Sequence, residues 1–168
     1  EYARDAVLRV IGNLRGQTSI VPHGLNPRFS KAPKLQRDIA EYNDSHPYRV
    51  LYVSVIDQYK HQWHVVEAVA ALRKQGVPIV LDLVGAAYPT ALKRLNQTID
   101  RVDVERCWVR YRGVIPYAEL HSMYAEADLA IWASTCETFG IILLEAMASG
   151  LPIACTFGLP FCLFFPYA

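Results

Sequence analysis

Two carboxylates stand in a stretch that is otherwise almost entirely apolar, the fifteen residues CETFGIILLEAMASG at positions 136–150. Glu145 follows the run Ile-Ile-Leu-Leu, so a helix formed here is apolar nearly all round and mostly buried. A buried carboxylate needs a hydrogen-bonding or charged partner. None of the residues three or four positions away on the same helix is cationic. The partner of Glu145 must therefore lie elsewhere in the fold or be a ligand.

The second carboxylate, Glu137, precedes Phe139 and Gly140, where a strand is expected to turn into this helix. The position puts Glu137 at the positive end of the helix, beside backbone N–H groups that have no acceptor within the helix. Two structural alternatives stay open at this point. In these, Glu137 only complements the helix dipole and Glu145 is half-exposed at a helix edge.

The composition is that of one folded domain. Hydrophobic residues make up 52% of the 168 residues and charged residues 20%, which excludes a disordered chain and allows one well-packed core. Seventeen basic residues are balanced by sixteen acidic ones, a formal net charge of +1. This balance gives no sign of a surface that binds nucleic acid or an anionic membrane.

The cysteines and histidines form no recognisable disulfide or metal-binding pattern. There is no C-x-x-C pair and no histidine at metal-ligand spacing from a cysteine, so we expect buried thiols in a reduced, cytoplasmic protein. His61 and His64 share one predicted helix, but a third ligand is missing from the pattern, which favours a solvated or packed role over a metal site. The cysteines are Cys107, Cys136, Cys155 and Cys162.

Neither end of the sequence carries a clear targeting signal. The sequence begins at Glu1 without a charged-then-apolar leader, so no signal peptide is expected in it. From Ala146 onward no residue is charged, a length that would span a bilayer. Prolines and glycines interrupt this run repeatedly, and a buried parallel strand followed by loops is the favoured interpretation.

From residue 49 onward, short apolar runs rich in β-branched residues alternate with helical patterns. This alternation, with strands apolar on both faces, predicts the α/β class with a doubly wound parallel, Rossmann-like sheet. The predicted strands are residues 49–56, 78–84, 108–111, 128–133 and 152–155, and the predicted helices are residues 61–75, 90–98, 117–126 and 139–149.

The chain before this pattern reads as an entry segment, residues 1–48. We expect a helix over residues 4–13, a strand over 19–21 and a surface segment over 29–47 with a short helix around 35–42. Residues 49–155 form the α/β unit, and residues 156–168 form a tail of a different character.

A parallel sheet of this kind binds ligands beyond the carboxyl ends of its strands. Lys60 and Glu137 both fall in loops at that edge, and Lys60 is placed to meet a phosphate, although a lone surface lysine is the common alternative. The G-x-G-x-x-G and P-loop fingerprints are absent, and so is an Asp-x-Asp pair that would hold a metal on a diphosphate. The loops at this edge are residues 57–60, 85–89, 113–116 and 134–139.

The stretch from Glu137 to Glu145 resembles the E-x7-E element of the retaining family 4 glycosyltransferases (glycosyltransferase group 1). It continues as Ala-Met-Ala-Ser-Gly-Leu-Pro, which is similar to the EAMA-x-G-x-P wording of that family. The resemblance covers the chain from about Tyr2 to Cys155. Further matching segments are VPHG at residues 21–24, VSVIDQYK at 53–60, LVG at 83–85, YRGVI at 111–115 and YAEAD at 124–128.

The resemblance implies a GT-B protein, in which two Rossmann-like domains face each other across a cleft. This chain would be the C-terminal half, with residues 49–155 binding the nucleotide sugar and the acceptor held mainly by an absent N-terminal domain. Lys60 would contact the diphosphate of the donor, and Glu145 would hydrogen-bond the ribose hydroxyls. Glu137 would be the catalytic carboxylate that holds the donor sugar.

The remaining donor-site residues implied by the resemblance act largely through the main chain. The amides of Phe139, Gly140 and Ile141 would hold the sugar and phosphate together with Glu137. The chain around Gly113 would meet the base. The same donor-binding set includes Gly85, Val114, Ile115 and Leu144.

The sequence departs from the family pattern at two places. Ser54 and Val55 stand where the family often has Gly-Arg, so one cationic contact to phosphate is missing and Lys60 would carry more of it. After Cys155 the match ends in the aromatic-rich tail TFGLPFCLFFPYA, which we interpret as a truncated or altered C-terminus.

The predicted function is therefore donor binding in a retaining, metal-independent transfer of a hexose from a nucleoside diphosphate to a glycan, lipid or other acceptor. We expect the isolated chain to be incomplete and inactive, with no nucleic-acid partner and with membrane association only through the full-length protein. The alternative is a non-catalytic α/β module that binds a nucleotide or a protein, with the two carboxylates structural. A nucleotide-sugar epimerase of the same architecture is a third candidate.

Overall fold

The structure is a computed structural model that describes residues 2–12, 16–17, 19, 21, 23–137 and 139–156. Strands and helices alternate along it from residue 48 onward, as the sequence predicts. The strands are β1 (Tyr48–Val53), β2 (Ile79–Val84), β3 (Val109–Tyr111), β4 (Leu129–Trp132) and β5 (Ile153–Cys155). The helices are α1 (Tyr2–Ile11), α2 (Gln62–Lys74), α3 (Pro89–Val102), α4 (Tyr117–Glu126) and α5 (Ile141–Ala148).

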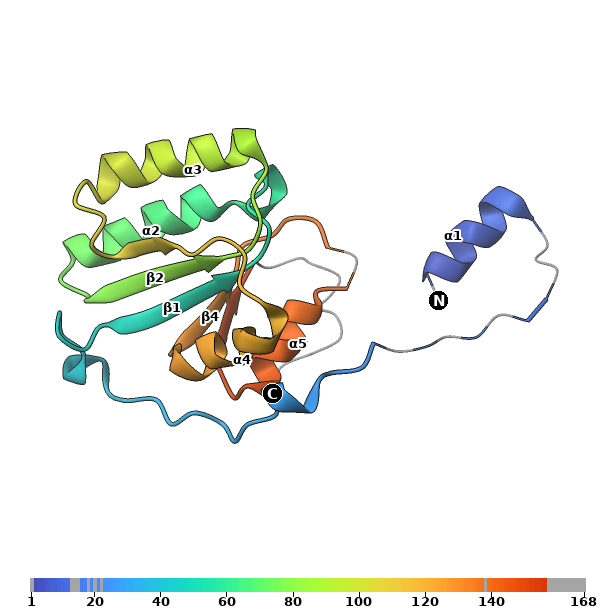
Figure 1. The fold of residues 1–168 in the computed structure, drawn as a ribbon, viewed down its shortest axis with the longest axis horizontal. Coiled ribbons are helices and arrows are strands. Elements are labelled where there is room, and N and C mark those ends of the chain that lie inside the picture. Colours follow the sequence, from blue (N-terminus) through green and yellow to red (C-terminus); the bar gives the residue numbers. More distant parts are fainter. Residues whose placement is uncertain are drawn as a thin grey trace.

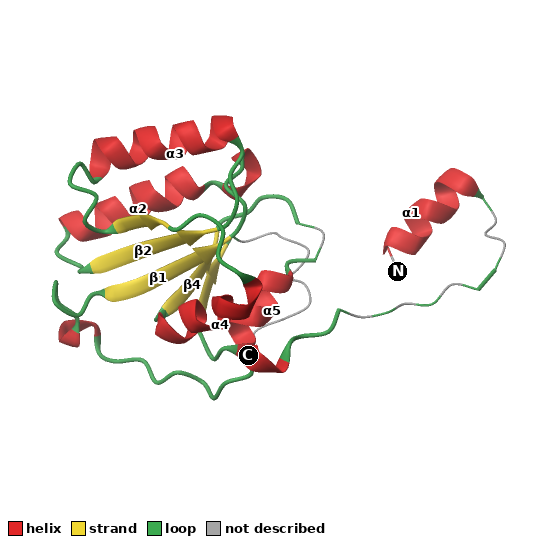
Figure 2. Ribbon diagram, viewed as in Figure 1, coloured by secondary structure: helices red, strands yellow, loops and turns green. Residues whose placement is uncertain are grey.

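The strands form one parallel sheet in the order β3-β2-β1-β4-β5. Helices α2 and α3 cover one face, and α4 and α5 cover the other (Figures 1 and 2). Alternate residues of β1 separate the two layers: Val50 and Tyr52 pack toward α2 and α3, while Leu51 and Val53 pack toward α4 and α5. The predicted doubly wound, Rossmann-like α/β fold is confirmed.

The central strands are apolar because both of their faces are buried. Strand β2, IVLDLV, is buried along its whole length and contains one charged residue, Asp82. The Asp82 carboxylate accepts a hydrogen bond of 2.7 Å from Arg112 Nε and lies 3.9 Å from Arg49 Nη2. A charge in this position is tolerated because these guanidinium groups pair with it.

The entry segment departs from its predicted structure. The expected helix around residues 35–42 is a single 3₁₀ turn, Ile39–Glu41, which Asp38 and Glu41 close with a capping box. Residues 19 and 21 of the expected strand carry no strand, and residue 20 lies outside the described part. Local hydrogen bonding by the Asp38 side chain favours the short turn over a longer helix.

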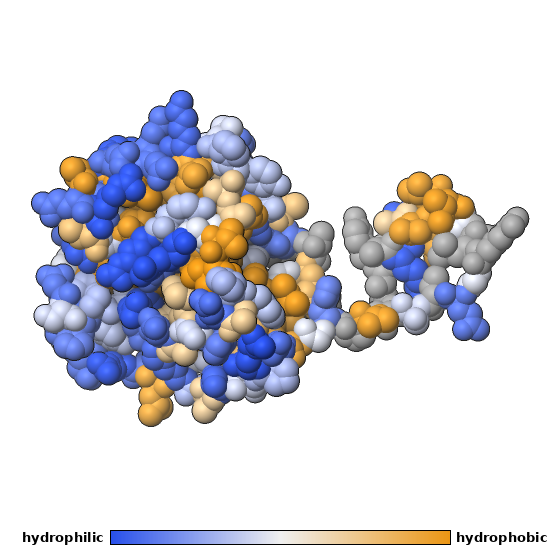
Figure 3. All heavy atoms as spheres, in the orientation of Figure 1, coloured by the Kyte–Doolittle hydropathy of each residue, from blue (hydrophilic) through white to orange (hydrophobic). Residues whose placement is uncertain are grey.

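Helix α1 lies away from the sheet (Figure 1). It ends at Ile11, two residues before the expected boundary. Apolar side chains gather on its surface (Figure 3), including the exposed Val7, Val10 and Ile11. The division of the chain into residues 1–48, 49–155 and 156–168 stays a prediction, and residues 157–168 lie outside the described part.

The three cysteines in the described part of the chain are exposed, so the prediction of buried thiols is wrong for them. Cys107 lies between α3 and β3, Cys136 follows β4, and Cys155 ends the edge strand β5. Loops and sheet edges leave side chains in contact with solvent, whatever their polarity.

Among the described residues, no helix is long and apolar enough to cross a membrane.

Residues 31–34 tie the entry segment to the end of α5. The backbone N–H of Lys31 donates to Ala148 O at 2.8 Å, and that of Lys34 donates to Gly150 O at 2.9 Å. The Lys34 ammonium also donates to Ala127 O at 2.6 Å and lies 3.0 Å from Asp128. Phe29, just before this tie, is fully buried against α4 and α5.

Gly150 permits this close approach, and its replacement tests the tie. Gly150 has a φ of +75°, and a Cβ there would collide with the carbonyl oxygen of Ala32 and lie 2.8 Å from Pro33 Cα. We expect Gly150→Ala to lower the free energy of unfolding by about 3 kcal/mol, because strain and collision add. Urea denaturation measures this change.

The matched control is Gly76→Ala, since Gly76 has a φ of +89° but open space where its Cβ would lie. It should cost only the backbone strain, about 1 to 2 kcal/mol. Equal losses in the two variants would show that residues 31–34 do not press against Gly150.

Candidate functional site

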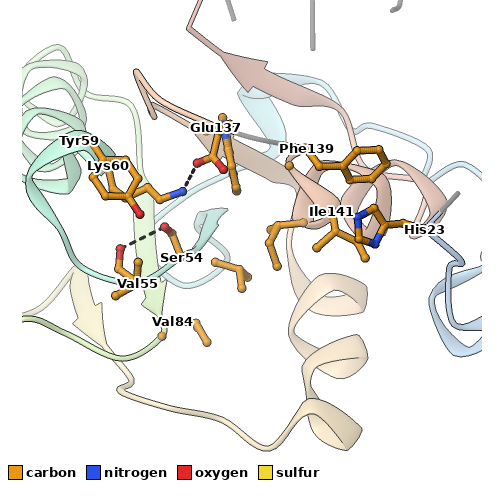
Figure 4. Close-up of a pocket in the computed structure, with 14 residues that line it drawn as sticks. His23, Ser54, Val55, Tyr59, Lys60, Val84, Glu137, Phe139 and Ile141 are labelled. Atoms are coloured by element: carbon orange, nitrogen blue, oxygen red, sulfur yellow. Dashed lines mark hydrogen bonds and ion pairs between the residues drawn. The ribbon is translucent and has the colours of Figure 1, made fainter. Parts of the chain in front are cut away.

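A cavity of about 440 Å³ opens at the carboxyl ends of β1 and β4 (Figure 4). The strand order reverses between these two strands, because β1 connects to β2 on one side and pairs with β4 on the other. Such a switch point is where open α/β sheets bind ligands, and the volume suits a small molecule. The cavity is lined by His23, Val53, Ser54, Val55, Tyr59, Lys60, Val84, Gly85, Trp132, Glu137, Phe139, Gly140, Ile141 and Ile142.

Lys60 supplies a buried positive charge to this cavity. It ends the 3₁₀ turn Gln58–Lys60 and is only 6% exposed. Its ammonium lies 4.6 Å from the centre of the Trp132 ring and 5.0 Å from that of Tyr59, and it forms an ion pair with Glu137. Aromatic faces and a carboxylate together stabilise a desolvated ammonium.

The main chain holds Lys60 in this place. The Tyr52 hydroxyl donates a 2.7 Å hydrogen bond to the Lys60 carbonyl oxygen, and burial raises the pKa of Tyr52 well above its ordinary value. The Asp57 carboxylate accepts from Gln58 N at 2.6 Å at the start of the turn. Lys60 is therefore positioned by the sheet and the turn, in contrast to a lone surface lysine.

The amino end of α5 forms the opposite wall of the cavity. Gly140 has a φ of +75° and turns the chain into the helix, which begins at Ile141. The first N–H groups of a helix have no acceptor within it, so they attract an anion. Figure 4 shows Phe139 and Ile141 beside His23, whose ring lies 4.4 Å from that of Phe139.

Glu145 lies outside the cavity lining and is almost fully buried, at 2% exposure. Its carboxylate accepts hydrogen bonds from the hydroxyls of Tyr117, at 2.9 Å, and Tyr124, at 3.5 Å. The expected partner thus lies elsewhere in the fold, on α4, and the alternative of a half-exposed Glu145 is wrong. Burial raises the pKa of this carboxyl group, and the two tyrosine hydrogen bonds offset part of the shift.

Some of the predicted site residues line the cavity and the others lie outside its lining. Val114 and Ile115 follow β3 in a loop outside the lining, and Leu144 lies half-buried on α5, as Glu145's neighbour. The roles of all these residues stay predictions. Those that line the common cavity are Lys60, Gly85, Glu137, Phe139, Gly140 and Ile141.

Some residues that line the cavity were not among the site residues predicted from the sequence. His23 reaches the cavity from the entry segment, and Tyr59 and Trp132 flank Lys60. Trp132 ends β4, so its place at the carboxyl edge of the sheet was a signal for it. His23 lies in the VPHG segment that resembles the family, but its contact with the cavity could not be predicted, because a contact between segments so far apart in sequence depends on the tertiary fold.

His61 precedes α2 and is partly buried, and His64, in the first turn of α2, is exposed. The rings of His61 and His64 stack 5.5 Å apart, and His61 Nε2 lies 3.1 Å from Thr135 Oγ1. Among the described residues, no group of three histidine, cysteine or acidic side chains could hold a metal ion.

Comparison with known proteins gives a family match over most of the chain. The family model described as "Glycosyl transferases group 1" matches residues 35–161. O-antigen chain mannosyltransferase B of Escherichia coli is 41% identical over 49 residues, which are 29% of this chain and 13% of that protein. The GtfA subunit of a UDP-N-acetylglucosamine–peptide N-acetylglucosaminyltransferase of Streptococcus pneumoniae is 30% identical over 107 residues, 64% of this chain and 20% of that protein.

Solved structures show the same architecture. Anabaena Alr3699/HepE in complex with UDP and glucose is 28% identical, with a TM-score of 0.58 over 67% of this chain and 30% of that one. WaaG, a glycosyltransferase involved in lipopolysaccharide biosynthesis, has a TM-score of 0.63 over 87% of this chain and 40% of that one. At 23% identity the second likeness shows the fold alone.

The raised pKa of Glu145 predicts how pH changes stability. The folded chain keeps a proton on Glu145 at pH values where the unfolded chain has released it, so stability is lost as the pH rises through the folded pKa. Glu145→Gln removes this loss. The free energy of unfolding of the variant, relative to that of the parent, should therefore rise as the pH increases above about 4, the ordinary pKa of a glutamate, and urea denaturation at a series of pH values measures this rise.

The comparison needs a background value, which Glu119→Gln provides because Glu119 is exposed in the first turn of α4. For each variant, the difference in free energy of unfolding from the parent is compared across the pH range. If this difference depends on pH in the same way for Glu145→Gln and Glu119→Gln, the buried carboxyl group does not have the raised pKa that its surroundings imply.

Proposed function

This chain belongs to the glycosyl transferases group 1 family, and from that premise we propose that its cavity binds the nucleoside diphosphate sugar of a glycosyl transfer reaction. One observation carries the proposal: the buried Lys60 ammonium and the amino end of α5 line the same cavity. A diphosphate is the kind of ligand that uses both a cation and a helix N-terminus.

In this proposal, binding of the donor breaks the ion pair between Lys60 and Glu137, and each residue then contacts a different part of the donor. The diphosphate carries more negative charge than one carboxylate, so it competes with Glu137 for Lys60. Glu137 is then free to accept hydrogen bonds from hydroxyls of the donor sugar. Because Ser54 and Val55 occupy the place where an arginine is common, Lys60 and the helix amides hold most of the diphosphate.

Glu145, Val114 and Ile115 complete the proposed nucleotide site. In this proposal Glu145 hydrogen-bonds the ribose, and the chain at Val114 and Ile115 contacts the base through its backbone. We place uridine first among the bases. The support is that Alr3699/HepE was solved with UDP and glucose, and that the GtfA relative is named for a UDP-sugar.

The reaction proposed for the whole protein breaks the bond between the sugar C1 and the diphosphate oxygen. The nucleoside diphosphate leaves with the electron pair, and Lys60 and the α5 amides stabilise the charge that develops on it. The acceptor hydroxyl forms the new bond to C1 and passes its proton to the departing diphosphate oxygen, with the α-configuration kept. This assignment of charge stabilisation to protein groups requires no metal ion.

Lys60→Ala tests the diphosphate contact. A charge-assisted hydrogen bond contributes about 1.5 to 3 kcal/mol, so the variant should bind UDP about ten- to a hundredfold more weakly than the parent. Calorimetric titration of the 168-residue chain with UDP, GDP and ADP, without added metal, measures this loss and identifies the base.

Lys93→Ala is the matched control, because Lys93 is exposed on α3, away from the cavity lining. Its affinity should equal that of the parent. The proposal fails if none of the three nucleotides binds to a chain that circular dichroism shows to be folded.

The isolated chain should bind the donor without transferring the sugar. Closure of both halves around the substrates excludes water and completes such sites, and the acceptor half is proposed to lie outside this sequence. A product assay with UDP-glucose and a panel of acceptors should show no product above background. Turnover by this chain alone would contradict the division of labour between two halves.

A further inference from the structure

Tyr117 stands at the boundary between solvent and the buried carboxylate of Glu145. It is the first residue of α4 and directly follows the loop of residues 113–116. Although 50% exposed, it donates a 2.9 Å hydrogen bond to Glu145 Oε1. Its ring lies 5.5 Å from that of Phe29, tilted by 55°. Tyr117 is thus held by one hydrogen bond and one ring contact while much of its surface is in water.

The second donor to Glu145 is held much more firmly. Tyr124 is 1% exposed, and its ring meets Phe29 edge-on at 5.7 Å. Its hydroxyl lies 3.5 Å from Glu145 Oε2, a longer contact than that of Tyr117. Tyr124 lies inside the core and has no path out of it. Of the two hydroxyls, only that of Tyr117 can leave without opening the core.

Glu145 lies close to the cavity in the sequence of α5, so the ability of the Tyr117 hydroxyl to leave it bears on ligand binding. Ile141 and Ile142 line the cavity, and Glu145 lies one helical turn further along α5. The Tyr117 hydroxyl therefore bonds to a residue that is one turn of α5 from the cavity wall, and neither Tyr117 nor Glu145 itself lines the cavity. When Tyr117 moves away, the same oxygen must accept from another donor, because an unpaired buried carboxylate is unfavourable.

We propose that the Tyr117 hydroxyl occupies the position on Glu145 Oε1 that a ribose hydroxyl of the nucleotide takes, so that Tyr117 moves away when the nucleotide binds. The proposal rests on the proposed function, since it assumes a nucleotide in the adjoining cavity. Tyr117 is then a specificity-determining residue. A ligand without a well-placed hydroxyl cannot replace the bond that Tyr117 gives up.

The chemistry of the phenol suits this role. Burial of the hydroxyl and its hydrogen bond to Glu145 raise the pKa of Tyr117, so the group stays protonated and donates throughout the neutral range. One neutral donor replaces another, so Glu145 Oε1 keeps a hydrogen bond in both states. The cost of binding is the broken phenol bond, which lowers the affinity for the nucleotide.

Tyr117→Phe tests the proposal because it removes the competing hydroxyl and keeps the ring against Phe29. We expect the variant to bind UDP about five- to tenfold more tightly than the parent in calorimetric titration. The gain should shrink for whichever of 2′-deoxy-UDP and 3′-deoxy-UDP lacks the hydroxyl that contacts Glu145. A merely structural effect of the substitution would not distinguish these analogues.

Tyr42→Phe controls for the loss of a phenol elsewhere, since Tyr42 packs against Tyr48 at the amino end of the sheet, 5.0 Å between rings. It should bind UDP as the parent does. Unchanged or weaker binding of UDP by Tyr117→Phe would overturn the inference while leaving the proposed function intact. An equal gain for UDP and both deoxy analogues would overturn it as well. If the parent binds none of UDP, GDP and ADP, the proposed function itself fails, and the inference with it.

Discussion

The parallel pairing of β1 with strands on both sides is the constraint from which the rest of the molecule follows. Tyr48 to Val53 pair in register with Ile79 to Val84 of β2, while Val50 and Leu51 pair with β4. Because every strand runs the same way, all carboxyl ends meet at one edge, and the crossovers leave that edge in opposite directions on either side of the β1–β4 boundary. Lys60, which follows β1, and Glu137, which follows β4, meet there for this reason.

Buried charge is handled differently at each of three places. Asp82, in the middle of the sheet, is paired with arginines, an arrangement that serves the fold. Lys60 is paired with Glu137 at the cavity, so either partner can be exchanged for a charged ligand. Glu145 has no cationic partner among the described residues and relies on tyrosine hydroxyls. Neutral donors leave the carboxylate's charge uncompensated, which explains why burial dominates its pKa.

The fold could be predicted from the sequence because the alternation of strand and helix patterns is local information. The meeting of Lys60 with Glu137 could also be predicted, since sheet topology places the loops of a parallel sheet at one edge. The tyrosine partners of Glu145 could not, because their approach depends on how α4 packs against α5. The same holds for His23 and for the irregular segment at residues 31–34, whose shape is set by contacts with Ala148 and Gly150. Exposure of the cysteines likewise depends on loop and edge positions that periodicity does not reveal.

The tie between the entry segment and α5 determines which stretch of chain could be transplanted as a working unit. Phe29 lies under both tyrosines that serve Glu145, and His23 forms part of the cavity wall. A hybrid enzyme joined at residue 49, where the regular pattern begins, would import the sheet without these two side chains and would mismatch the surface around Gly150. A junction placed before residue 23 would carry the cavity wall, the Phe29 contact and the tie together, and so would be the suitable crossover point for exchanging this cavity among relatives.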